Sequence, residues 1–197
     1  MENVVIWGYT GYKWLSVPLA KEIKRQHQAK IHFICTNARS VEYWKRQDTE
    51  GIIDSFVTIG HFFFEYDQCG DKMDEIFARA RELELIYGVY VVDALQTDRH
   101  LGRGFFAGGV GHPKSKLSKK AEYVKSVNLF NRTFEFWEEY FDHTHADLVI
   151  GFSSSLVGKI CTTVARYRAI TARTLFLAGY QSYHGWATDE YFSLPSI

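Results

Sequence analysis

Short apolar runs alternate with helical segments along most of the chain, and this alternation constrains the fold more than any other feature. Each run holds three to five mainly apolar residues, and most runs are followed by a stretch with helical spacing of apolar side chains. The expected strands are residues 4–7, 31–35, 55–59, 89–92, 148–150 and 174–177. Strands joined by helices predict a Rossmann-like three-layer α/β domain with a mostly parallel sheet of about six strands. We expect a single such domain to span residues 1–197.

A second periodic pattern predicts a long helix in the second half of the chain. Large apolar side chains recur there at steps of three or four residues. They are Tyr123, Val127, Phe130, Phe134, Trp137 and Phe141. This spacing places them on one face of a helix, where we expect them to pack into the core and not to form an aromatic binding site.

Composition and charge narrow the class of protein. The 23 Lys and Arg residues balance 23 Asp and Glu residues, which does not favour a general nucleic-acid-binding protein. The three cysteines form no Cys-x-x-Cys pair, so we expect buried free thiols and neither a disulfide framework nor a metal site. No apolar stretch approaches the ~18 residues that suggest a membrane span, and the N-terminus lacks signal-peptide features. These features favour a cytoplasmic protein without a transmembrane segment.

Ligands of parallel α/β sheets bind beyond the carboxyl ends of the strands, so the segments that follow the predicted strands are the candidate site. Gly8, Tyr9, Thr10 and Gly11 follow the first strand, and their two glycines allow a close approach of backbone to ligand. The spacing is not the G-x-G-x-x-G of dinucleotide-binding proteins, so NAD is not favoured. These four residues are candidates for binding a substrate or phosphate, with a plain strand-to-helix turn as the equal alternative.

The serine-rich segment 151–155 also ends a predicted strand and opens a helix. It lacks the second glycine of a nucleophile elbow, and six residues separate Gly151 from Gly158, too many for a Walker A loop. Ser153 and Ser154 are candidates for binding a sugar hydroxyl or a phosphate at a helix N-terminus. Capping of the helix by the same two serines is the alternative.

Residues 98–120 form a long, glycine-rich basic loop, the most unusual segment of the chain. Residues 99–125 hold seven basic side chains and one acidic side chain. Arginine gives bidentate hydrogen bonds to phosphate, and long loops of this kind are commonly functional. We therefore expect Arg99 and Arg103 to bind an anion, with a solvated surface loop as the alternative.

Two carboxylates border this loop. Asp93 is expected to end the strand 89–92, and Asp98 begins the loop. Each is a candidate catalytic residue that accepts a proton from a hydroxyl, and each could instead hold an arginine in place. Residues 179–186 combine aromatic and polar side chains, among which His184 is a candidate for substrate binding. The alternative role of that segment is an interface with another domain.

The order of these features resembles the N-terminal half of two-domain glycosyltransferases of the GT-B architecture. The likeness is to those that build capsular or other surface polysaccharides. It is carried by the loop D-R-H-L-G-R-G-F that begins at Asp98, by the aromatic helix from Asn128 to Trp137, and by the A-D-L-V-I run at 146–150. The resemblance implies an acceptor-side domain that uses a nucleotide-sugar donor and a carbohydrate or lipid-linked carbohydrate acceptor. It also implies a C-terminal partner domain outside these 197 residues, no bound metal or cofactor, and a location in the cytoplasm or at the inner face of the membrane.

In such a transfer, an acceptor hydroxyl attacks the anomeric carbon of the donor. Asp93 or Asp98 would accept its proton, and the arginines would offset the charge of the leaving diphosphate. Two other functions stay open on the sequence. One is a self-contained phosphate- or nucleotide-binding α/β enzyme, and the other is a noncatalytic domain that binds a polyanion or a protein.

Overall fold

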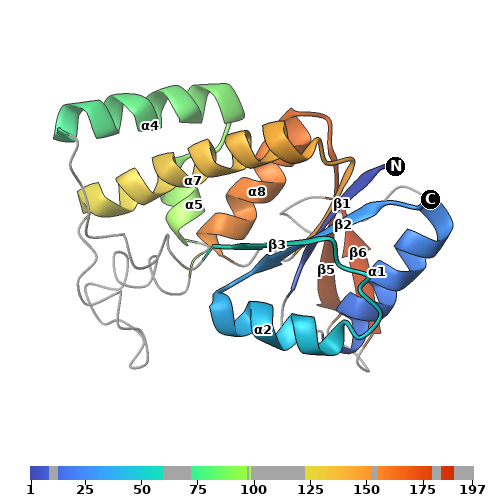
Figure 1. The fold of residues 1–197 in the computed structure, drawn as a ribbon. Helices are drawn as coiled ribbons and strands as arrows, with labels where there is room; N and C mark the ends of the chain where they lie inside the picture. Colours follow the sequence, from blue (N-terminus) through green and yellow to red (C-terminus); the bar gives the residue numbers. More distant parts are fainter. Residues whose placement is uncertain are drawn as a thin grey trace.

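A computed structural model describes residues 1–8, 13–59, 72–96, 98, 123–151, 155–178 and 183–188. Within them, helices cover both faces of a six-stranded sheet (Figure 1). The strands are β1 (Asn3–Trp7), β2 (Lys30–Cys35), β3 (Ser55–Thr58), β4 (Leu148–Gly151), β5 (Thr171–Ala178) and β6 (Tyr183–Ala187). The helices are α1 (Lys13–His27), α2 (Ala38–Gln47), α4 (Met73–Tyr87), α5 (Val91–Gln96), α7 (Tyr123–Thr144) and α8 (Leu156–Tyr167).

The strand order is β3-β2-β1-β4-β5-β6, in which the first five strands run parallel and β6 is antiparallel to β5. The chain builds outward from β1 to β3, then crosses through α4, α5 and α7 to place β4 on the other side of β1. The order therefore reverses between β1 and β4, as in doubly wound sheets. The predicted Rossmann-like three-layer fold with a mostly parallel sheet is confirmed.

Alternation of side chains along β1 divides the core into two layers. Val4 and Ile6 belong to the cluster that α1 and α2 cover, whereas Val5 belongs to the cluster formed with α4, α5, α7 and α8. All three side chains are buried. A strand buried on both faces reads as a continuous apolar run, which is why this strand is visible in the sequence.

The long helix α7 packs between α4 and α8, with α4 on the outside of the layer (Figure 1). Its predicted core stripe is confirmed from Val127 to Phe141, while Tyr123 at the first turn is half exposed. Polar residues are buried around the same helix. They are Ser126, Asn128, Asn131 and Thr133. Neither α7 nor any other helix in the described part of the chain is long and apolar enough to cross a membrane.

The predicted strand at 89–92 is wrong. Gly88 ends α4 in the left-handed conformation with φ 66°, and α5 begins three residues later at Val91. The Val91 N–H donates to the Glu84 carboxylate at 2.8 Å, so a side chain of α4 caps the new helix. A run of four apolar residues fits a strand and a buried helix equally well. Here the hydrogen bond from Val91 to Glu84 stabilises the start of a helix.

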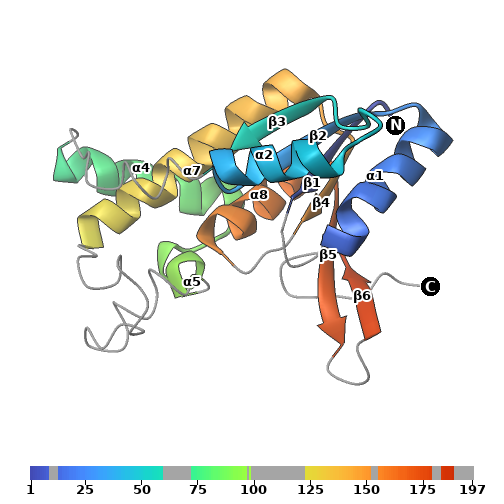
Figure 2. The same ribbon diagram turned by 60° about the horizontal axis from the view of Figure 1, so that its bottom comes forward.

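The sixth strand is instead β6, which the sequence did not predict. β5 pairs with β4 from Thr171 to Thr174 and with β6 from Thr174 to Ala178. The β5–β6 ribbon therefore continues past the last paired residue of β4, and Figure 2 shows it projecting from the body of the domain. The count of six strands was right, but one of the six was placed in the wrong segment.

Asp147 ties the amino ends of β1 and β4 together. Its carboxylate accepts hydrogen bonds from the backbone N–H groups of Glu2 and Asn3, and its own N–H donates to the Asn3 carbonyl at 2.9 Å. The hydrogen bonds from Asn3 and Glu2 hold the pKa of Asp147 below its ordinary value. The ionised carboxylate therefore stabilises the folded state.

We expect Asp147→Asn to be less stable than the wild type at pH 7. A lowered folded-state pKa contributes stability above the ordinary aspartate pKa of about 4, and that contribution is lost as the pH falls through the lowered value. The difference in the free energy of unfolding between variant and wild type, measured by urea unfolding, should therefore become smaller below about pH 4. Glu42→Gln, on an exposed position of α2, is the control. A gap that stays constant from pH 7 to pH 2 contradicts the prediction.

Candidate functional site

The candidate site lies at the carboxyl edge of the sheet, where the strand order reverses between β1 and β4. β1 ends at Trp7 and is followed by Gly8, and β4 ends at Gly151. The two strands are neighbours, paired from Val4 with Leu148 to Ile6 with Ile150. In open α/β sheets, the crevice at this switch point is the usual ligand site.

Gly8 is explained by close packing against Trp44 of α2. A Cβ atom on residue 8 would lie 2.6 Å from Trp44 Nε1, which is closer than any side chain tolerates. The Trp44 indole N–H donates to the Gly8 carbonyl at 2.8 Å, and the Gly8 N–H donates to the Ile34 carbonyl at 2.8 Å. The backbone after β1 is thus held from two sides by α2 and β2, so packing alone accounts for a glycine at this position.

Gly151 has the same relation to Trp7. A Cβ atom on Gly151 would lie 2.6 Å from the Trp7 ring, which itself packs 5.8 Å from the Trp137 ring of α7, centroid to centroid. The Trp137 indole N–H donates to the Val157 carbonyl in the first turn of α8 at 2.9 Å. Two tryptophans therefore fix the position of α8 relative to the carboxyl edge.

The N-terminus of α8 is capped by one hydroxyl group and one carboxylate. Ser155 is the N-cap, and its Oγ accepts from the Gly158 N–H at 3.1 Å. Asp98 Oδ2 accepts from the Leu156 N–H at 3.1 Å, and Asp98 is only 1% exposed. The alternative expectation that Ser153 or Ser154 caps this helix is wrong, since the cap is the next residue along.

Lys159 is a site residue that the sequence analysis missed. It lies in the second turn of α8, is 4% exposed, and its Nζ donates to the Asp93 backbone carbonyl at 3.5 Å. The signal was present in the sequence, because a single charge interrupts the apolar helix 156–165. Buried lysines are rare and mark positions where other groups offset the cost of burying the charge.

The two candidate catalytic carboxylates lie at the two ends of α5. Asp93 is an exposed residue in the first turn of the helix and not the end of a strand. Asp98 is buried just beyond the last turn. Figures 1 and 2 show α5 beside the start of α8, and the two helices are in contact. Both carboxylates therefore belong to one corner of the carboxyl edge.

Several predicted site residues lie outside the described part of the chain. They are Tyr9, Thr10, Gly11, Arg99, Arg103, Ser153 and Ser154. His184 is described in its backbone, where it pairs with Leu177 on the antiparallel β5–β6 ribbon. Among the residues described, no group of three or more His, Cys, Asp or Glu side chains could hold a metal ion.

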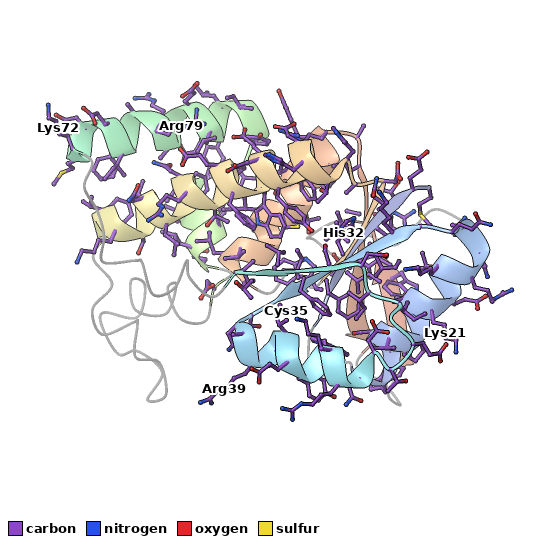
Figure 3. All side chains as sticks on the ribbon, viewed as in Figure 1. Lys21, His32, Cys35, Arg39, Lys72 and Arg79 are labelled. Carbon is purple, nitrogen blue, oxygen red and sulfur yellow. The ribbon has the colours of Figure 1, made fainter. Side chains whose placement is uncertain are left out.

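The two described cysteines are packing residues. Cys35, labelled in Figure 3, ends β2 and belongs to the core cluster that α1 and α2 cover. Cys161 lies within α8. Both are free and buried, as expected from the sequence. Burial raises the pKa of Cys35 to about 12, and it raises the pKa of Cys161 further although a hydrogen bond from Trp7 opposes the shift. Thiols of this kind are protonated at neutral pH and are poor nucleophiles.

No protein-family model matches the sequence, and neither a curated protein nor a solved structure matches it. The fold and the geometry of the carboxyl edge are thus the basis for any statement about function.

Proposed function

We propose that this chain is the acceptor-side domain of a glycosyltransferase. It would take part in moving a sugar from a nucleotide-sugar donor to a carbohydrate or lipid-linked carbohydrate acceptor in surface polysaccharide synthesis. The proposal places the chain in the cytoplasm or at the inner face of the membrane, with a C-terminal domain that holds most of the donor.

The observation that carries the proposal is a pair of buried charges beside the switch point. Asp98 and Lys159 both lie at the carboxyl edge of a Rossmann-like sheet. Charged side chains are rarely buried, so two of them beside the usual ligand site of such a sheet favour a role there. The next residue in sequence after Asp98 is Arg99, which opens a segment with seven basic side chains and one acidic side chain. Such a segment suits a ligand with phosphate groups.

The proposed chemistry is a direct displacement at the anomeric carbon. The acceptor hydroxyl oxygen forms a bond to that carbon, and the bond to the donor phosphate breaks, so the nucleoside diphosphate leaves with the electron pair. Asp93, an exposed carboxylate at this edge, is our candidate for taking the hydroxyl proton. Arg99 and Arg103 would offset the charge on the leaving diphosphate.

Calorimetric titration of the 197-residue chain with nucleotide sugars and glycosyl 1-phosphates tests the proposal. A hydrogen bond to a charged group contributes about 1.5–3 kcal/mol, so Arg99→Ala and Arg103→Ala should each weaken binding by about tenfold or more. Arg81→Ala, on an exposed position of α4, is the matched control and should bind like the wild type. Unchanged binding in both loop variants contradicts the assigned role of these arginines.

The strand order itself favours one other function. A sheet with its switch point complete inside one domain can bind a nucleotide without a second domain, as in a self-contained nucleotide-binding enzyme. In that case a nucleoside diphosphate alone should bind as tightly as any nucleotide sugar. A glycosyltransferase acceptor domain should instead gain affinity from the carbohydrate.

A further inference from the structure

Helix α5 is too short to be stable by itself, so contacts with its neighbours must hold it. It has six residues, and isolated helices need more than about 12 residues to be even marginally stable. Val91, Ala94 and Leu95 bury its apolar side against α7 and α8. Its start is capped by Glu84 of α4. The other end of the helix meets the first two turns of α8.

Two polar contacts join α5 to α8, and they run in opposite directions. The Asp98 carboxylate accepts from the Leu156 N–H of α8, while the Lys159 ammonium of α8 donates to the Asp93 carbonyl of α5. The Asp98 N–H also donates to the Leu95 carbonyl, so Asp98 closes the last turn of α5 with its own backbone. Each end of this junction therefore satisfies backbone groups that a helix terminus leaves without a helical partner.

The charges in this junction match the helix dipoles. A carboxylate is favourable at the positive N-terminal end of α8, and the Lys159 ammonium meets the Asp93 carbonyl, one of the last four carbonyls of the six-residue α5. The Asp98 carboxylate also takes the place at the Leu156 N–H that an anionic ligand would otherwise take. The α8 terminus is thus engaged by the protein itself.

We infer that Asp98 and Lys159 are positioning residues that lock α5 onto α8. They thereby fix the position of Asp98, which precedes Arg99 in the sequence. This inference rests on the proposed function for its consequence in ligand binding. On this view Asp98 acts as a hydrogen-bond acceptor. Asp93 is the better candidate for accepting a proton, because Asp93 is exposed, whereas Asp98 is buried and accepts from the Leu156 N–H.

A pair of variants that both remove the charge of Asp98 tests the lock. Asp98→Asn keeps an oxygen that can accept from the Leu156 N–H, whereas Asp98→Ala does not. We expect Asp98→Ala to bind inorganic pyrophosphate about tenfold more weakly than Asp98→Asn, and to lose about tenfold in amide-exchange protection over residues 91–98. Asp74→Ala, on an exposed position in the first turn of α4, is the control.

Two further measurements distinguish this positioning role of Asp98 from other roles that it could have. Formate at high concentration should restore stability to Asp98→Ala but not alter Asp98→Asn, because a small carboxylate can refill the vacated place at the α8 terminus. If Asp98 acted only through its charge, both variants would bind pyrophosphate more tightly than the wild type. If it acted only as a proton acceptor, both would bind like the wild type. Either result overturns the inference.

The test also distinguishes the lock from the proposed function. If the wild type binds neither pyrophosphate nor nucleotide sugars, the proposed function fails, while amide exchange over 91–98 still decides whether the lock exists. Should Asp98→Ala not fold, Lys159→Met removes the second contact and leaves the Leu156 bond intact. Wild-type protection of α5 in Lys159→Met then overturns the inference, and a loss of protection supports it.

Discussion

Replacing Trp44 by alanine is expected to lower the free energy of unfolding by about 3–5 kcal/mol, the usual range for a buried aromatic side chain. Trp44 is a residue of α2 whose side chain is fully buried against the sheet. Its ring packs edge-on against Phe33, with 5.4 Å between the ring centroids. Its indole N–H is the donor that holds the Gly8 carbonyl at the end of β1. Urea unfolding followed by circular dichroism measures the change.

A substitution at Gly8 tests the same contact from the other side. Gly8→Ala alone should cost about 1–3 kcal/mol, because its Cβ would overlap the Trp44 ring and force a shift in a packed region. In the Trp44→Ala background the same change should cost far less, since the space is then open. The double-mutant cycle therefore shows strong coupling. Additive effects of the two substitutions would contradict the packing explanation of Gly8.

The sequence predicted the central sheet because its strands are buried on both faces. β1 and β4 appear as continuous apolar runs that end at a glycine, and β2 is apolar from Ile31 to Cys35 except for His32. β6 could not be found in this way, because Tyr183–Ala187 carries a histidine and a glycine and is a strand only through its pairing with β5. Segment 89–92 failed for the opposite reason, since it has strand-like composition but Glu84 caps it as a helix.

Two of the candidate site residues were expected at the carboxyl edge, but their contacts were not predicted. Asp93 lies there in α5 and not at the end of a strand, and Asp98 lies just beyond the last turn of the same helix. The bond from the Leu156 N–H to Asp98 joins residues 58 positions apart, and no local pattern encodes such a pair. Lys159 was missed, although it is the single charged residue of the apolar segment 156–165.

Three tryptophan contacts hold the described part of the carboxyl edge in place. Gly8 is held by Trp44, Gly151 is covered by Trp7, and α8 is held by Trp137. Three tryptophans therefore set the backbone positions against which α5 and Asp98 pack. Precise placement of this kind is what a binding site needs from its scaffold.

The second large effect is expected at Trp137, where alanine should lower the free energy of unfolding by about 3–5 kcal/mol. The side chain is fully buried in α7, packs against Trp7, and donates to the Val157 carbonyl of α8. For a domain of this size, about 2–4 °C of melting temperature is lost for each kcal/mol, so we expect a drop of about 6–20 °C. Differential scanning calorimetry measures it.

Two variants separate the contributions of Trp137. Trp137→Phe keeps an aromatic ring but removes the indole donor, so it should cost less than alanine and isolate the bond to α8. Trp14→Ala makes the same chemical change at a site that is 57% exposed, and it should cost under about 1 kcal/mol. Trp7 covers Gly151 and packs on Trp137. Trp137→Ala should therefore also loosen the first turn of α8 and reduce the amide-exchange protection of that turn. A Trp137→Ala protein as stable as Trp14→Ala would mean that the tryptophans do not hold the carboxyl edge.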